Sequence, residues 1–158
     1  MRSDFESGAR NERSVGKITL IFDGGSRGNP GPSAFCYILM DDGGILCIHS
    51  EYIGIATNNL SEYVGFLNGL RYLVNFVDPS KSVLKIKTDS ELIVKQMKGD
   101  YSIRNPKLKE LADEIKFILS RFKDFDLSHI PRSENLADEF VRRILESRKK
   151  GRDVEDNS

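Results

Sequence analysis

The segment Ile18–Pro32 is the feature that most constrains how this chain can fold. It begins as an apolar run of residues that favour β-strands and reaches a carboxylate at Asp23. Two glycines follow, and then a stretch of Ser, Arg, Gly, Asn and Pro that continues neither a strand nor a helix. An acid at the carboxyl end of a buried strand is where α/β proteins place ligand chemistry. Asp-Gly alone is also an ordinary turn, so the interpretation depends on the other acidic positions.

The composition is that of one globular domain. The chain has 158 residues, of which 39% are hydrophobic and 30% charged, enough for one core and hardly for two. No apolar run approaches the roughly 20 residues that cross a bilayer. Segment 1–16 has neither the apolar stretch of a signal peptide nor the Arg-rich pattern of a transit peptide. We therefore expect a cytoplasmic protein, by default a monomer, with a domain at 17–147 and flexible tails at 1–16 and 148–158.

The cysteines and the charge distribution limit the kinds of binding site that the chain can form. Cys36 and Cys47 lie in apolar, strand-like runs and are expected to be buried free thiols, although a disulfide across a hairpin stays open. Two Cys and two His provide no zinc-type spacing. The formal net charge is zero, but segment 81–109 carries eight Lys or Arg against three Asp or Glu. That excess predicts either a surface that attracts phosphates or a plain solvated surface.

Periodicity and turn residues predict the element order β-β-β-α-β-α-α-β-α. Strands are expected at 17–23, 33–40, 45–55, 83–88 and 125–130, and helices at 57–76, 90–98, 105–122 and 135–145. Asp-Asp-Gly-Gly at 41–44 predicts a tight turn, so the first three strands form an antiparallel meander. Strands joined by helical crossovers run parallel. The fold class is therefore α/β, with a five-stranded mixed sheet flanked by helices.

Four acidic residues fall at one edge of this sheet. Asp23 ends the first strand, Asp89 follows the fourth, and Glu62 lies near the start of the helix between them. Asp138 lies in the first turn of the last helix. Four carboxylates in one place repel one another, so a stable fold gathers them around a cation. Oxygen ligands without His or Cys select Mg²⁺ or Mn²⁺, and two such ions about 4 Å apart are used in phosphodiester cleavage.

Four motifs resemble those of the type 1 ribonuclease H family, and the agreement extends over residues 17–145. They are DGGSRGNPG at 23–31, TNNLSE at 57–62, TDS at 88–90 and PRSENLAD at 131–138. The resemblance implies the ribonuclease H-like fold. It also implies an endonuclease that cuts the RNA strand of RNA/DNA hybrids and leaves 5′-phosphate and 3′-hydroxyl ends.

The resemblance further implies a role for each carboxylate. Asp23 would be shared by two metal ions, and Asp138 would complete the ion beside the attacking water. Glu62 and Asp89 would complete the ion beside the leaving 3′ oxygen. Such an arrangement fixes cations where charge develops on the scissile phosphate.

Recognition of RNA requires contacts that detect the 2′-hydroxyl. The backbone at Gly24, Gly25 and Ser26 permits close approach to a minor groove, and Thr57 at a helix N-terminus suits a DNA phosphate. For Asn58, plain helix capping explains the residue equally well. The resemblance implies further substrate contacts by Asn29, Asn58 and Asn59, and Ser90 is a candidate beside them.

The chain also departs from the best-known members of that family. The span between Met97 and Asn105 has no room for their lysine-rich, aromatic protrusion, Trp is absent, and no separate hybrid-binding domain fits in 16 residues. We therefore expect weak, salt-sensitive substrate binding. Glu134, four residues before Asp138, resembles a Glu that assists product release in another branch, whereas His129 is expected to be structural. Compact members of this kind sometimes also cut double-stranded RNA. The resemblance therefore leaves open whether this chain cuts double-stranded RNA as well as the hybrid.

Other classes of protein fit the sequence less well. A 3′–5′ exonuclease of the same superfamily would carry Asp-x-Glu where this chain has Asp-Gly-Gly at 23–25. The Gly/Pro stretch has the spacing of neither a P-loop nor a dinucleotide-binding loop and leads into a strand. The alternative that stays open is a non-catalytic module that binds hybrid or double-stranded RNA through a vestigial metal site.

Overall fold

The computed structural model describes the backbone of residues 16–156 and the side chains of residues 16–149. The expected N-terminal tail at 1–16 therefore lies outside the described residues, apart from Gly16. The elements follow one another along the chain as β1 (Lys17–Ser26), β2 (Gly31–Asp41), β3 (Gly44–Ala56), α2 (Asn58–Leu73), β4 (Val83–Thr88), α3 (Glu91–Met97), α4 (Pro106–Ser120), β5 (Asp124–His129) and α5 (Asp138–Asp156), with short 3₁₀ turns at Pro79–Lys81 and Arg132–Glu134.

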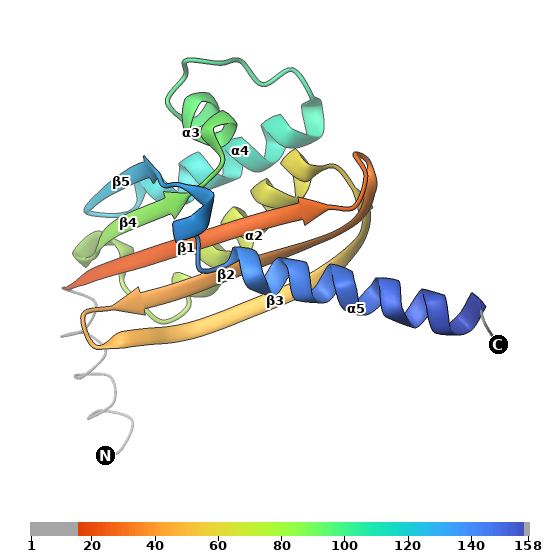
Figure 1. The fold of residues 1–158 in the computed structure, drawn as a ribbon. Helices are drawn as coiled ribbons and strands as arrows, with labels where there is room; N and C mark the ends of the chain where they lie inside the picture. Colours follow the sequence, from red (N-terminus) through yellow and green to blue (C-terminus); the bar gives the residue numbers. More distant parts are fainter. Residues whose placement is uncertain (1–15, 157–158) are drawn as a thin grey trace.

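The strands form one five-stranded mixed sheet in the order β3-β2-β1-β4-β5 (Figure 1). β1, β2 and β3 pair antiparallel, whereas β4 runs parallel to both β1 and β5. The predicted meander and the predicted parallel core are both confirmed. The carboxyl ends of β1, β4 and β5 consequently point the same way, which is the condition for the predicted gathering of acidic residues.

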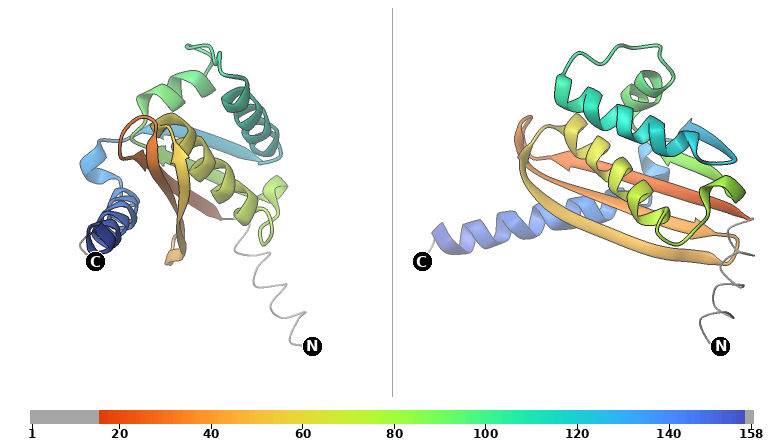
Figure 2. Two further views of the ribbon diagram at one scale, coloured as in Figure 1. Left: turned by 90° about the vertical axis from the view of Figure 1, so that its right-hand side faces the viewer. Right: turned by 180° about the vertical axis from the view of Figure 1, so that it is seen from behind.

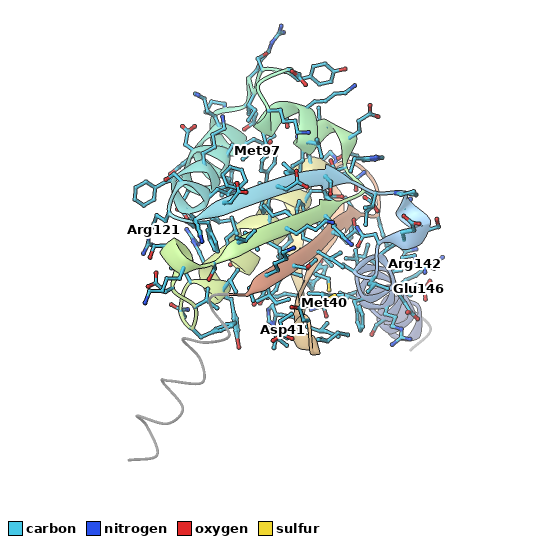
Figure 3. The ribbon with its side chains drawn as sticks, turned by 90° about the vertical axis from the view of Figure 1, so that its left-hand side faces the viewer. Met40, Asp41, Met97, Arg121, Arg142 and Glu146 are labelled. Atoms are coloured by element: carbon cyan, nitrogen blue, oxygen red, sulfur yellow. The ribbon has the colours of Figure 1, made fainter. Side chains whose placement is uncertain are left out.

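Helices cover both faces of the sheet (Figure 2). α2, α3 and α4 lie on one face over the larger core, to which Leu20 and Phe22 contribute from β1. α5 lies on the other face over a smaller core that includes Ile21 and Val141. Figure 3 shows Met97 and Arg121 on the side of α3 and α4, and Arg142 and Glu146 along α5. Alternation along β1 therefore supplies both cores, as the period of a strand requires.

Two glycines of α2 allow the helix to approach the sheet closely, as the sequence predicts. A Cβ atom on Gly65 would lie 3.2 Å from the carbonyl oxygen of Asp23, and one on Gly69 would lie 2.8 Å from Leu20 Cδ1. α2 begins where expected, because the Thr57 hydroxyl accepts a hydrogen bond from the Leu60 N–H. The close contact places the second and third turns of α2 against residues 20–23 of β1.

Three elements differ most from their predicted bounds. β1 continues past residue 23 to Ser26, because residues 24–26 pair with residues 33–35 of β2. α2 ends at Leu73 rather than near residue 76, since the chain tightens there into turns in which the Asn75 and Phe76 N–H groups donate to Tyr72 and Leu73. The last helix starts at residue 138 instead of 135 and continues far beyond 145, to residue 156.

The two cysteines are free, which leaves no disulfide across the hairpin. Cys36 is paired in register with Ser50, and Cys47 with Leu39. Cys36 belongs to the core under α5, whereas the half-buried Cys47 packs against the core under α2. The two thiols therefore face opposite sides of the sheet.

Candidate active site

Asp23 lies on the central strand of the sheet, close to the start of α2. Its side chain is buried, with 4% of its surface exposed. Gly24 follows it directly, and a Cβ atom there would lie 2.4 Å from the backbone nitrogen of Glu62. Glycine at this position therefore lets α2 pack directly on β1 and carries Glu62 to the side of Asp23.

Three of the four predicted carboxylates come together. Oxygen atoms of Asp23, Glu62 and Asp89 all lie within 4.8 Å of one another. Asp23 and Glu62 are buried, and Asp89 is half-buried. They come from β1, from α2 and from the residue after β4, so the parallel pairing of β1 with β4 and the packing of α2 on β1 bring them together.

Burial makes the negative charge of this cluster costly. Desolvation, together with the charge of Asp89, raises the pKa of Asp23 from 3.8 to about 7. Burial and the charge of Asp23 raise the pKa of Glu62 well above its usual value of 4.5, and burial raises the pKa of Asp89. The cluster therefore holds protons near neutral pH unless a cation compensates its charge.

The carboxylate of Asp89 is oriented by Asn135, which precedes α5. The side-chain amide of Asn135 donates to Asp89 Oδ2 over 3.2 Å and to the carbonyl oxygen of Phe22 over 3.0 Å. The imidazole of His129 lies 3.2 Å from the carbonyl oxygen of Asp89, which fits the structural role expected for it. The Asn135 bond lowers the pKa of Asp89 and so opposes part of the effect of burial.

Asp138, the fourth predicted carboxylate, stands at the edge of the cluster. It is the first residue of α5, and its side chain is 16% exposed. Arg132 approaches Asp138 Oδ1 at 3.3 Å, and Arg142, one helical turn further on, approaches Oδ2 at 3.0 Å. Asp138 thus faces the same cavity as the other three acids, but two arginines hold its carboxylate.

The carboxylates line an open cavity of about 580 Å³. Most of the predicted substrate-contact residues lie around it, namely Gly24, Gly25, Ser26, Asn29, Asn58, Asn59 and Ser90. Among the described residues, the lining does not include Thr57, which caps α2, or Glu134, which lies exposed in the turn before α5.

Several of these residues also have structural partners. Asn29 Oδ1 accepts a hydrogen bond from the Asn58 N–H over 3.0 Å and ties the β1–β2 turn to α2. The Ser26 hydroxyl is 3.0 Å from the carbonyl oxygen of Ala56 and also contacts Gly28. Ser90 caps α3 by accepting from the Ile93 N–H over 3.2 Å. These contacts fix the rim of the cavity.

The sequence reading missed five residues of the lining. They are Leu92, Arg132, Val141, Arg142 and Leu145. For Arg142 the signal was present, because it lies four residues after Asp138 and such pairs meet on a helix. The other four could be found only from the packing of α3, of the turn 132–134 and of α5 around the sheet.

The donor set fits a divalent metal. Glu62 Oε2 is a buried oxygen that has no hydrogen-bond partner within the described residues. Buried polar atoms nearly always have a hydrogen-bond partner. A buried carboxylate oxygen without one, next to two further carboxylates, is therefore suited to bind a cation. The ligands of this cluster are all oxygens, as Mg²⁺ and Mn²⁺ prefer.

Comparison with known proteins agrees with this site. The sequence profile of a family described as reverse transcriptase-like matches residues 21–143, a span that includes all four carboxylates. The crystal structure of RNase H1 from the halophilic archaeon Halobacterium salinarum superposes with a TM-score of 0.76 at 34% identity, and the match covers 84% of this chain and 99% of that one. The chain belongs to the type 1 ribonuclease H family. As expected for a compact ribonuclease H, residues 98–105 join α3 to α4 as a short loop.

Two further ribonuclease H structures are similar. The structure of LC11-RNase H1 in complex with an RNA/DNA hybrid matches with a TM-score of 0.73 and 39% identity, over 80% of this chain and 94% of that chain. The N-terminal ribonuclease H domain of Rv2228c from Mycobacterium tuberculosis matches with a TM-score of 0.78 and 29% identity, over 86% of this chain and 98% of that domain.

The full-length relatives are longer than this chain. Ribonuclease HI of Halobacterium salinarum is 35% identical over 121 residues, which is 76% of this chain but 59% of the relative. The bifunctional protein Rv2228c is 35% identical over 121 residues, which is 75% of this chain but 32% of the relative. The similarity therefore concerns the ribonuclease H domain. Within residues 16–156, no helix combines the length and the apolar character needed to span a bilayer.

Proposed function

We propose that this ribonuclease H is an endonuclease that hydrolyses the RNA strand of RNA/DNA hybrids. The observation that carries the proposal is the buried group of Asp23, Glu62 and Asp89, whose oxygens lie within 4.8 Å of one another at the floor of an open cavity. A hybrid-bound structure of the similar LC11-RNase H1 supports the choice of substrate.

The four carboxylates would hold the metal ions of the reaction, with Mg²⁺ as the expected ion and Mn²⁺ as a substitute. Asp23, Glu62 and Asp89 supply ligands from inside the cavity, and Asp138 supplies one from its edge. When bound, a pair of such ions activates water and neutralises the charge that develops on the scissile phosphate. The expected products carry 5′-phosphate and 3′-hydroxyl ends.

The rim of the cavity would recognise the RNA strand. The backbone at Gly24 and Gly25 and the side chains of Ser26, Asn29 and Asn59 line the same cavity as the carboxylates, within reach of the sugars of a bound strand. Asn58 and Ser90 flank them at the starts of α2 and α3. Thr57, at the N-terminus of α2, would bind a phosphate of the DNA strand.

Glu134 would act after cleavage, by assisting release of the product. It lies exposed in the turn 132–134, four residues before Asp138, and outside the cavity lining within the described chain. That position, beside the cavity but outside its lining, suits a group that acts on the product and not on the metal. We therefore assign it a role in turnover and not in the binding of metal.

Cleavage of labelled duplexes tests the proposal. RNA/DNA hybrid, double-stranded RNA and double-stranded DNA are incubated separately with the protein in Mg²⁺, in Mn²⁺ and in EDTA. We expect the hybrid to be cut in either metal and left intact in EDTA, and DNA to stay intact throughout. The double-stranded RNA sample decides how strictly the site requires a DNA strand. A folded protein that binds hybrid but cuts nothing in either metal would overturn the proposal in favour of a binding module.

A further inference from the structure

α5 extends beyond the sheet that it packs on. The sequence predicts that the last helix ends at Leu145, but the helix continues to Asp156. Two opposite views show this C-terminal part projecting past the β1–β2 turn, at the carboxyl end of β1 (Figures 1 and 2). The projection therefore lies on the side of the molecule toward which the carboxyl ends of β1 and β4 point, and Asp23 and Asp89 line the cavity near these ends.

The cavity of the carboxylates runs along the same helix. Its lining includes Asp138, Arg142 and Leu145 on α5. It also includes Ser26, at the end of β1, and Asn29, in the β1–β2 turn. Positions 138, 142 and 145 are separated by four and three residues, so they follow one line along the helix. This face of α5 therefore forms one wall of the cavity over two helical turns. The same face continues onto the projecting part of the helix.

The chemistry of that face changes where the sheet ends. Over the sheet, Val141 and Leu145 are buried in the smaller core. The next position of the series is Lys149, which is exposed, and the sequence places Arg152 after it. Apolar residues would continue here if the face packed on more protein, so basic residues indicate an anionic partner or water.

The neighbouring basic residue is turned elsewhere. The guanidinium of Arg148 lies over the ring of Tyr52 on β3, 4.0 Å from its centre. Arg148 and Lys149 therefore have the same formal charge and lie next to each other in the chain, yet one faces the sheet edge and the other continues the wall of the cavity. The pair allows a contact made by Lys149 to be separated from a general effect of charge.

We propose that the projecting part of α5 is a second contact surface for the phosphates of a nucleic-acid duplex, with Lys149 as its first contact. The inference rests on the proposed function, because it assumes that a duplex occupies the carboxylate cavity. Lys149 follows Asp138 by eleven residues, about 16 Å along a helix, which corresponds to about five base-pair steps of a duplex. A hybrid that continues past the cavity along α5 reaches Lys149.

The salt dependence of binding tests this surface. Affinity for a 20-base-pair RNA/DNA hybrid is measured between 50 and 200 mM salt, in an Asp23→Asn background that keeps the hybrid uncut. Each neutralised phosphate contributes about −0.9 to the slope of log affinity against log salt. We expect Lys149→Gln to reduce this slope by about 0.9, so that its loss of affinity relative to the parent is about 3.5-fold greater at 50 mM than at 200 mM.

Two matched variants serve as controls. Arg148→Gln removes the same charge one residue away, and Lys123→Gln removes one at the amino end of β5, on the opposite edge of the sheet. Both should keep the slope of the parent. Equal slopes for Lys149→Gln, Arg148→Gln and the parent would overturn the inference and identify α5 as a solvated helix, while cleavage by the unaltered chain would leave the proposed function intact. Failure of the unaltered chain to bind or cut hybrid would overturn both.

Discussion

The side-chain amide of Asn135 donates to the carboxylate of Asp89 over 3.2 Å and links the start of α5 to the end of β4. The same amide donates to the carbonyl oxygen of Phe22, so one buried side chain joins three parts of the site. Asn135 is 5% exposed, and the bonds that it makes have no ready replacement from water. It positions Asp89 without belonging to the carboxylate cluster.

Replacement of Asn135 by Ala should affect both stability and pH dependence. The loss of the side-chain hydrogen bonds to Phe22, Asp89 and Ala137 is expected to lower the free energy of unfolding by about 1–3 kcal/mol. Because the bond lowers the pKa of Asp89, its removal should also shift the acidic limb of the cleavage profile to higher pH. Urea unfolding and a pH–rate profile measure the two effects. Asn68→Ala, which removes an amide bonded within α2, should leave the pH profile in place.

Stability without metal should fall as the pH rises. The pKa of Asp23 is raised from 3.8 to about 7, so the folded, metal-free protein keeps a proton that the unfolded chain releases above about pH 4. The free energy of unfolding therefore decreases between about pH 4 and pH 7, by about 1.4 kcal/mol per pH unit for each such proton. Urea unfolding in EDTA at pH 5 and pH 7 tests this sign.

Addition of Mg²⁺ provides the matching comparison. A bound cation favours the deprotonated cluster, so the decline with pH should shrink in Mg²⁺. Asp23→Asn removes one of the titrating groups and should also shrink the decline in EDTA. The account of the cluster fails if stability rises with pH in EDTA, or if Mg²⁺ leaves the slope unchanged.

Gly24→Ala should damage both packing and activity. The added Cβ would lie 2.4 Å from the backbone nitrogen of Glu62, an atom that cannot move without displacing α2. We expect a loss of about 1–3 kcal/mol in stability and a large loss of cleavage. Gly25→Ala is the control for stability, because its nearest neighbour is the side chain of Val141 at 3.1 Å, which can shift. Comparable stability for the two variants would refute the packing role of Gly24.

Glu134→Gln should slow turnover without eliminating it. Glu134 lies outside the cavity lining within the described residues, so its loss should cost less than the roughly 100-fold typical of a general acid or base. Multiple-turnover cleavage should slow more than a single turnover, since release of the product is the affected step. Glu146→Gln, on the exposed side of α5, provides a control. An unchanged multiple-turnover rate would remove Glu134 from the mechanism.

The sequence predicted the fold where its signals are local. Thr57, Ser90 and Asn105 cap the helices that were expected to start beside them, and strand 83–88 has the bounds predicted for it. These features depend on short-range periodicity and on side chains that bind nearby backbone groups. The clustering of Asp23, Glu62 and Asp89 followed once parallel strands were inferred.

The features that the sequence did not reveal depend on contacts between distant segments. The need for glycine at position 24 comes from the backbone of α2, and the contact of Arg132 with Asp138 became visible only once the turn 132–134 and α5 were placed. The length of α5 was underestimated because apolar residues become rare after Leu145.

The most direct test of the carboxylate cluster is Asp23→Asn, assayed for cleavage and for hybrid binding in the same Mg²⁺ buffer. Because Asp23 is buried next to Glu62 and Asp89, the substitution removes a central ligand together with a repulsive charge. We expect cleavage to fall to the level seen in EDTA, while affinity for the hybrid is kept or improved. Cleavage at the rate of the unaltered protein would contradict the assignment of these carboxylates as the metal-binding centre of the reaction.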